Sequence, residues 1–472
     1  MSRTDAPAPP RPEPAGSGAP LARFMRPING FVERWIPSAL LFSIVLTLVI
    51  AVAGVFTMIA RPDAPASPGD AVVAVLKGWG DGLSGLLAFM TQMALILLLG
   101  HMLAHTRPVR RLLSWLAGRP QSAGFAYVFV FVIAAIASLI NWGLGLVVGG
   151  ILAKEVAASA RRRGLQLHFP MLVAAGFSGF VVWHMGYSAS GPLTAATPES
   201  FIAVQLGEVL PISRTIFAPW NIAAAVATIV IVGLALWAIA PRGTDRIIEL
   251  TADISEQAAP ADDVETPADR LDASRVPTLI IGLMLVVYAI IHFAQGGTVT
   301  LDIVNWMFLA LILLLSRNAF EVIRLTKDAA SNVGEILLQF PLYAGIMGMM
   351  SASGLVQLLS DAFVGISTPV TFGLFAFLSA GLVNFFVPSG GGQFAVQAPI
   401  LLDAAEKLGV DPAIPIMATA YGDQWTNMIQ PFWAIPLLAI AGLKMRDVLA
   451  FTTVTLVASG VVFGTTLVLA SL

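Results

Sequence analysis

One stretch in the last quarter of the chain limits the possible folds most strongly, Asn384-Phe-Phe-Val-Pro-Ser-Gly-Gly-Gly-Gln393. Pro388 and three consecutive glycines separate two apolar runs, 371–383 and 394–405, and these residues disfavour a continuous helix. Each run has about a dozen residues, so at ~1.5 Å per residue either arm reaches little more than half of a bilayer. The pattern predicts a re-entrant hairpin whose broken backbone is buried in protein or lines a cavity.

A similar break between two apolar arms, 126–140 and 146–157, occurs earlier in the chain at Asn141-Trp-Gly-Leu-Gly145. Two broken segments in corresponding positions of two halves indicate the substrate site of a secondary transporter.

Composition supports a membrane protein. The chain has 472 residues, of which 57% are hydrophobic and only 11% are charged, which is too few charges to cover a soluble globule of this size. We therefore predict an all-α polytopic protein with the lipid bilayer as a partner. The absence of cysteine excludes disulfides and thiolate catalysis, and a net charge of -2 gives no reason to expect a nucleic-acid partner.

Basic residues set the expected orientation. Arg23, Arg26 and Arg34 precede the first apolar run, 37–60, which places the N-terminus in the cytoplasm of a bacterial inner-membrane protein. In the resulting topology, only four of the 26 Lys and Arg residues fall outside: Arg61, Lys77, Arg214 and Lys407.

The order of segments predicts an inverted-topology repeat with about nine spans, two re-entrant hairpins and two interrupted helices. The expected parts are a disordered cytoplasmic N-terminus (1–22), a first membrane repeat (23–241, with hairpin 122–158 and interrupted helix 169–205), a cytoplasmic linker (242–275), a connector span (276–300), and a second, inverted repeat (301–472, with hairpin 369–407 and interrupted helix 412–443).

Four breaks are expected to meet near the bilayer midplane: the two hairpin tips and the interruptions at 187–197 and 421–430. Free N–H groups at the start of a half-helix suit an anion. The candidate substrate-binding residues are Asn141, Trp142, Gly143, Ser188, Ser190, Thr194, Thr197, Asn384, Pro388, Ser389, Gly390, Gly391, Gly392, Gln393, Trp425, Thr426, Asn427 and Gln430.

None of these polar residues is a Lys or Arg, so a monovalent carboxylate would be held by amides, hydroxyls and helix ends. An apolar wall of Trp142, Phe385, Phe386, Trp425 and Trp433 would suit a short alkyl tail, which favours a small fatty acid as substrate. Other small organic anions, such as dicarboxylates, and a passive anion channel stay open as alternatives. An intramembrane enzyme would need a nucleophile–base pair or a metal triad, and the sequence shows neither. No cofactor is expected beyond Na⁺ as a candidate coupling ion.

Four residues are candidates for ion coupling. Asp423 is the one acidic residue inside a predicted break, so it is either a cation ligand or protonatable group, or an acid held by half-helix N–H groups for structure alone. His184 either titrates near neutrality or is a hydrogen-bonded structural residue. Asn141 and Asn384 have either a site role or the role of hairpin caps.

Four stretches carry a resemblance: Ile140-Asn-Trp-Gly-Leu-Gly-Leu-Val-Val-Gly149, Phe386-Val-Pro-Ser-Gly-Gly-Gly392, Ala420-Tyr-Gly-Asp-Gln-Trp425 and Gln430-Pro-Phe-Trp-Ala-Ile-Pro436. In them the sequence resembles the short-chain fatty acid transporter (AtoE-type) family, within the ion-transporter superfamily. The resemblance implies uptake of compounds such as butyrate and acetoacetate, a scaffold with a mobile transport domain, and often a homodimer working as an elevator.

By the same resemblance, the substrate and cation sites would be lined by Asn141, Ser389, Gly390, Gly391, Thr426 and Asn427. The sequence departs from the family pattern at Trp183-His-Met-Gly186, where a more glycine-rich run is expected, and at Asp423, where glutamate is usual. The coupling ion and the range of substrates therefore stay open.

Overall fold

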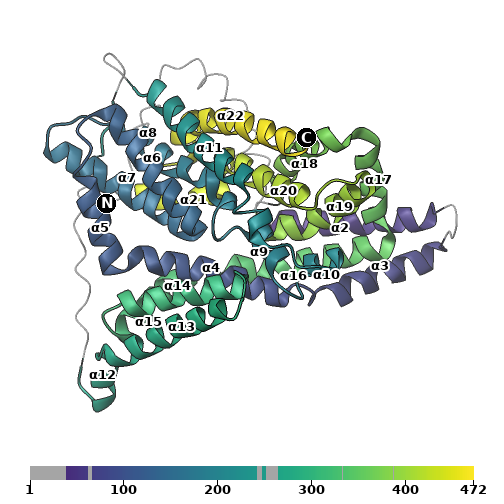
Figure 1. Ribbon diagram of the computed structural model, residues 1–472, viewed down its shortest axis with the longest axis horizontal. Coiled ribbons are helices and arrows are strands. Elements are labelled where there is room, and N and C mark those ends of the chain that lie inside the picture. The colour runs from purple at the N-terminus through teal and green to yellow at the C-terminus, as the bar shows by residue number, and fades with distance from the viewer. Residues whose placement is uncertain are drawn as a thin grey trace, which may run out of the picture.

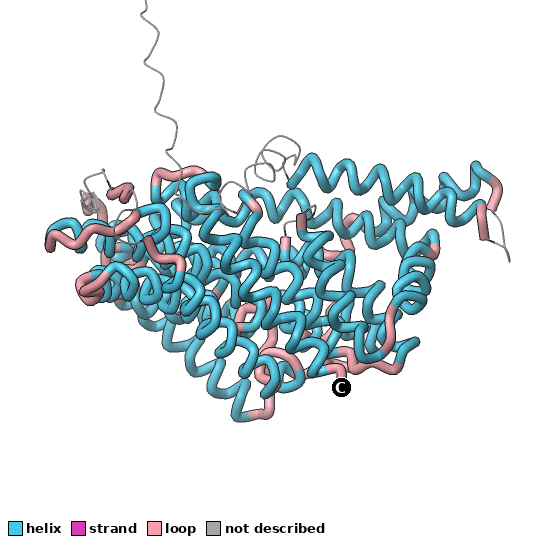
Figure 2. The backbone as a smooth tube through the Cα atoms, turned by 90° about the horizontal axis from the view of Figure 1, so that it is seen from above, coloured by secondary structure: helices cyan, strands magenta, loops and turns pink. Residues whose placement is uncertain are grey.

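The computed structural model describes residues 39–61, 66–241, 247–250, 264–331, 333–385, 387 and 389–472. The predicted N-terminal segment 1–22, most of the linker 242–275, and Phe386 and Pro388 lie outside the described residues. Across the described chain the regular structure is helical, as Figure 2 shows. Nine of its helices are long and apolar enough to cross a membrane. The expectation of an all-helical polytopic protein with about nine spans is confirmed.

The nine candidate spans are not the nine that the sequence predicted. Both arms of the first hairpin qualify, because α6 (Ala123–Ile140) and α7 (Trp142–Arg162) have 18 and 21 residues and extend beyond the predicted arms 126–140 and 146–157. The first helix of the predicted second repeat, Leu301–Leu315, has only 15 residues and is not among the candidate spans, and the predicted interrupted helix 412–443 is divided near Gln430. Arm length alone therefore does not identify the first hairpin as re-entrant.

An outer layer runs along one side of the molecule, the lower side in Figure 1. Close packing within it depends on glycine, since a Cβ added at Gly348 of α16 would lie 2.1 Å from the carbonyl oxygen of Gly78 in α3. The layer consists of α2 (Ala39–Ile59), α3 (Pro68–Gly82), α4 (Leu87–His105), α13 (Val276–Ala294), α14 (Leu301–Leu315), α15 (Ala319–Ala330) and α16 (Gly334–Ser353).

The inner layer carries the breaks, and every residue of its segment Phe169–Ala196 is buried except the half-buried Tyr187. This layer consists of α6, α7, α8 (Phe169–Ser178), η1 (Gly179–Met185), α9 (Ser190–Ala196), α18 (Pro369–Asn384), α19 (Gly390–Leu408), α20 (Ala413–Thr426), η3 (Asn427–Ile429), α21 (Pro431–Ala441) and α22 (Met445–Ala470). The remaining helices are α5 (Arg107–Ala117), α10 (Phe201–Leu206), η2 (Ile212–Arg214), α11 (Pro219–Ala238), α12 (Pro267–Asp272) and α17 (Leu355–Ile366).

The order of elements repeats. In each half a helical pair broken at its tip (α6/α7 and α18/α19) is followed by an α-helix, a 3₁₀ turn, a gap and another helix (α8–η1–α9 and α20–η3–α21). The two tips have similar backbone geometry, with φ −152° at Asn141 and φ −146° at Ser389. The halves are joined by buried hydrogen bonds, including Ser178 Oγ to Thr455 Oγ1 at 2.7 Å.

Candidate functional site

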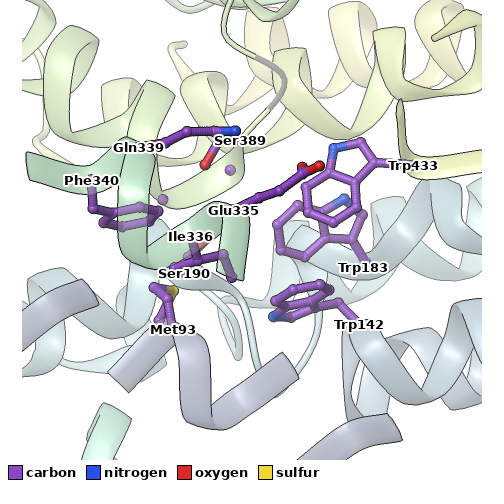
Figure 3. Close-up of a pocket in the computed structure, with 12 residues that line it drawn as sticks. Met93, Trp142, Trp183, Ser190, Glu335, Ile336, Gln339, Phe340, Ser389 and Trp433 are labelled. Atoms are coloured by element: carbon purple, nitrogen blue, oxygen red, sulfur yellow. The ribbon is translucent and has the colours of Figure 1, made fainter. Parts of the chain in front are cut away.

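The breaks of both halves open on one pocket between the inner and outer layers (Figure 3). The inner layer contributes the first residues of α7, α9 and α19, together with η1 and α21, and the outer layer contributes α4 and α16. The lining residues are Met93, Trp142, Trp183, Ser190, Glu335, Ile336, Gln339, Phe340, Ser389, Gly390, Gly391 and Trp433.

Hydrogen bonds within the protein fix the first tip, at Asn141 and Trp142. Asn141 is fully buried and caps α7, because its Oδ1 accepts from the Leu144 N–H at 2.9 Å. Its Nδ2 donates to the Ile96 carbonyl of α4 at 3.3 Å. The Trp142 N–H donates to Ser188 Oγ at 3.0 Å. Much of the donor capacity at the start of α7 is therefore used within the protein.

The second tip leaves more donors available. Ser389 caps α19 by accepting from the Gly392 N–H at 3.2 Å, and its carbonyl accepts from the Gln393 N–H at 2.7 Å. The N–H groups of Gly390 and Gly391 belong to the first turn, where a helix has no internal acceptors for them. Both glycines line the pocket, so α19 presents its positive end to the pocket.

Three tryptophans form one wall of the pocket. Trp142 and Trp433 pack edge to face with ring centroids 5.3 Å apart, and Trp183 lies 5.8 Å from Trp142. Trp142 and Trp183 are only 3% and 2% exposed, and their indole N–H groups have no acceptor among the described residues. Buried indole N–H groups usually find a partner, so these two donors are suited to a ligand with acceptor oxygens.

A buried acid and imidazole lie directly behind the glycines. His184 Nε2 lies 3.3 Å from Asp423 Oδ2 and 3.1 Å from Ser190 Oγ, and both ionisable side chains are 1% exposed. Gly390 separates this group from the pocket, because a Cβ there would lie 2.4 Å from Trp183, 2.7 Å from His184 and 2.9 Å from Asp423. Only glycine lets the start of α19 approach the pair so closely.

Asn384 organises the loop behind the second tip rather than the pocket. Its Nδ2 lies 2.8–2.9 Å from the Asp423 carbonyl, Thr426 Oγ1 and Asn427 Oδ1, and its own carbonyl accepts from Gln430. The structure thus brings these predicted residues together next to Asp423, but they do not line the pocket.

The other predicted residues lie around the site in different roles. Thr197 Oγ1 accepts from the Leu301 N–H of α14 at 3.2 Å, and Thr194 bonds back to Ser190. Gln393 donates to the Ala380 carbonyl at 2.8 Å. Trp425 faces α22, where its indole donates to the Leu456 carbonyl at 2.7 Å. Gly143 packs against Leu97 of α4, Gly392 against Tyr343 of α16, and Pro388 is outside the described residues.

Six lining residues were predicted from the sequence neither as substrate-binding nor as part of the apolar wall. Five of them come from the outer layer, Met93, Glu335, Ile336, Gln339 and Phe340, and the sixth is Trp183 from η1. The outer-layer residues belong to apolar helices without a break, so no local pattern marks them. Trp183 had one usable signal, because it directly precedes His184 in a segment that departs from the family pattern.

Comparison with known proteins decides the family. Residues 20–470 match the Short chain fatty acid transporter family. The chain belongs to this family. A relative in Escherichia coli (strain K12), named "Putative short-chain fatty acid transporter", is 39% identical over 450 residues, which are 94% of this chain and 98% of that protein. A relative of the same name in Haemophilus influenzae is 34% identical over 453 residues, 94% and 98% of the two chains. The chain is thus a multi-pass membrane transporter rather than an enzyme.

Two solved structures share the fold of this short-chain fatty acid transporter family member. The Alcanivorax borkumensis YdaH transporter, described as having an unusual topology, superposes with a TM-score of 0.58 at 16% identity, covering 91% of this chain and 98% of that one. Neisseria gonorrhoeae MtrF, from a class of antimetabolite efflux pumps, gives a TM-score of 0.51 at 14% identity, covering 94% and 97%. At these identities the likeness concerns the fold alone.

Proposed function

We propose that this protein is a secondary active transporter that imports short monocarboxylates, such as butyrate or acetoacetate, together with a cation. The observation that carries the proposal is the pairing, in one pocket, of the first turn of α19, whose Gly390 and Gly391 line the pocket, with a wall of three tryptophans. The names of the E. coli and H. influenzae relatives support the substrate class.

The carboxylate would bind at the start of α19. The N–H groups of Gly390 and Gly391, the hydroxyl of Ser389, and the indole N–H groups of Trp142 and Trp183 are the donors that surround this end of the pocket. The described residues that line the pocket include no Lys or Arg. Neutral donors at a helix start bind a single negative charge without holding it too tightly for release. The alkyl tail would then lie against the tryptophan rings.

Asp423 and His184 are the groups we assign to ion coupling. The Asp423 carboxylate is buried, and its nearest polar partner is the His184 imidazole rather than a ring of oxygens. Na⁺ is a hard cation and prefers oxygen ligands, so this arrangement favours a proton over Na⁺ as the coupling ion. A carboxylate moving with one proton carries no net charge, and accumulation would then follow the pH gradient.

Movement of the inner layer against the outer layer would carry the pocket across the membrane. The pocket is lined from both layers, as an elevator or rocking mechanism around an inverted repeat requires. With this mechanism we propose an inner-membrane location and a cytoplasmic N-terminus, which the distribution of basic residues favours. We also propose tips at mid-bilayer depth, as an inverted repeat favours, and the homodimer that the family resemblance implies.

Uptake into proteoliposomes tests the proposal. Purified protein would be reconstituted, and labelled butyrate uptake measured under an inward proton gradient, an inward sodium gradient, or neither. We expect accumulation above the external concentration only with the proton gradient. Accumulation with the sodium gradient alone would show that Na⁺, and not a proton, is the coupling ion. Flux that equilibrates without accumulation under every gradient would show a channel. No butyrate flux in any condition would contradict the substrate class.

A further inference from the structure

One acidic side chain of the pocket has no part in the proposed carboxylate binding or ion coupling. Glu335 lies in the first turn of α16, in the outer layer, and its side chain extends toward the tryptophan wall (Figure 3). It is exposed, and it forms no hydrogen bond or ion pair with the described residues. A carboxylate without a cationic partner therefore lines the same pocket that would bind an anion.

The position of Glu335 relative to the other charged and polar groups of the pocket indicates which part of a bound substrate it would face. The other ionisable groups beside the pocket are His184 and Asp423, behind Gly390 on the opposite, inner-layer side, and Tyr343 of α16, whose hydroxyl donates to Gln339. The donors for a carboxylate are also on the inner-layer side, at Ser389, Gly390 and the indoles. A substrate bound there would direct its far end along the tryptophans, toward Glu335.

We infer that Glu335 is a specificity-determining residue that excludes dicarboxylates. This inference rests on the proposed function. A substrate with an uncharged tail would place a methyl or keto group near Glu335. A dicarboxylate of the same length would instead place a second negative charge near the Glu335 carboxylate, which no Lys or Arg among the described residues neutralises. Discrimination by an introduced repulsion, rather than by added attraction, is a common route to specificity. The simpler reading, a first-turn acid that only stabilises the dipole of α16, predicts no effect on substrate choice.

Butyrate, succinate and succinamate form a matched set, because they have the same chain length and differ at the far end, which is a methyl, a carboxylate or a neutral amide. The concentrations of succinate and succinamate that halve butyrate uptake would be measured in proteoliposomes for the wild type, Glu335→Gln and Glu335→Asp. Glu406→Gln is the control, since it removes one acidic charge from an exposed position at the end of α19, away from the pocket.

In the wild type, succinamate should compete far better than succinate. In Glu335→Gln, the ratio of succinate to succinamate potency should rise about tenfold or more, since like charges several Å apart at an effective dielectric of ~20 repel by at least that factor. Glu335→Asp and Glu406→Gln should keep the wild-type ratio.

An unchanged ratio in Glu335→Gln would overturn the inference while leaving the proposed function intact, because butyrate uptake by the wild type is read in the same experiment. If Glu335→Gln does not transport, the same ratio is read from the rise in melting temperature that each acid gives in detergent. A shift with succinate that equals that of the wild type would again overturn the inference. Absence of butyrate uptake by the wild type would instead contradict the proposed function.

Discussion

The Asp423 side chain is deeply buried, and His184 is its one ionisable partner among the described residues. Its Oδ2 lies 3.3 Å from His184 Nε2 and neither oxygen accepts a hydrogen bond among the described residues. A carboxylate at this depth is costly unless it is protonated or paired, so we argue that it carries the coupling proton.

Asp423→Asn removes the titratable group at nearly constant volume. We expect the variant to lose gradient-driven accumulation of butyrate by at least about tenfold, while exchange of labelled for unlabelled butyrate across the membrane persists, because exchange needs no net proton movement. Asp411→Asn is the matched control, since Asp411 is half-exposed and pairs with Arg214 at 2.7 Å outside the pocket. Accumulation by Asp423→Asn at the wild-type level would refute the coupling role.

Gly390 shows how one missing side chain shapes the site. Replacing glycine by alanine within a helix usually adds about 0.5–1 kcal/mol of stability. At Gly390 the new Cβ would instead come within 2.9 Å of Trp183, His184 and Asp423.

We therefore expect Gly390→Ala to lower both the melting temperature and butyrate uptake, the latter by roughly tenfold or more, given the precision that a binding site requires. Gly365→Ala in α17 is the control, because a Cβ there meets no atom within 4 Å. It should be neutral or slightly stabilising in the same detergent melting and uptake assays. Equal behaviour of the two variants would show that the close packing at Gly390 has no functional importance.

At the scale of the helix, Asn141 ends one element and begins the next. It caps α7 through Leu144 and also ties this tip to α4 through the Ile96 carbonyl. Loss of an N-cap costs about 1 kcal/mol, and Asn141→Ala should lower stability by at least that amount. Ser67→Ala removes the exposed cap of α3, where Ser67 Oγ accepts from the backbone N–H of Asp70 at 3.2 Å.

Both cap variants should melt earlier than the wild type, but only Asn141→Ala should reduce butyrate uptake severalfold, since only this cap holds a residue of the pocket wall, Trp142, in place. Melting in detergent and initial uptake rates measure the two effects separately. Normal uptake by a destabilised Asn141→Ala variant would show that the residue acts as a hairpin cap alone.

The breaks were predictable because proline, glycine and capping residues act locally, and a sequence displays them directly. It was harder to predict which residues near a break face the pocket, because this depends on where the helix ends. The helix α20 continues to Thr426 and a 3₁₀ turn to Ile429, so the break comes at Gln430, later than the predicted start at Tyr421. That continuation turns Trp425 toward Leu456 and away from the pocket. The outer-layer residue Glu335 could not be found at all from sequence, because only packing of distant helices brings it to the tips.

At the scale of the whole molecule, transport by a moving inner layer requires that contacts between the layers break and re-form. One such contact joins Thr197 at the end of α9 to the Leu301 N–H at the start of α14, at 3.2 Å. Another contact of α14 stays within the outer layer, where Gln92 of α4 donates to Asp302 at 2.9 Å. The chain contains no cysteine, so pairs of cysteines can be introduced without a background.

In the variant with Thr197→Cys and Leu301→Cys, a short reducible crosslinker should abolish butyrate uptake, and dithiothreitol should restore it. The pair Gln92→Cys and Asp302→Cys should crosslink as efficiently and keep its uptake, because it joins two helices that we expect to move together. Comparing each variant before and after reduction separates the effect of the link from that of the substitutions. If the inner layer does not slide past the outer layer, the first crosslinked variant will transport as fast as its reduced form, and the elevator proposal fails.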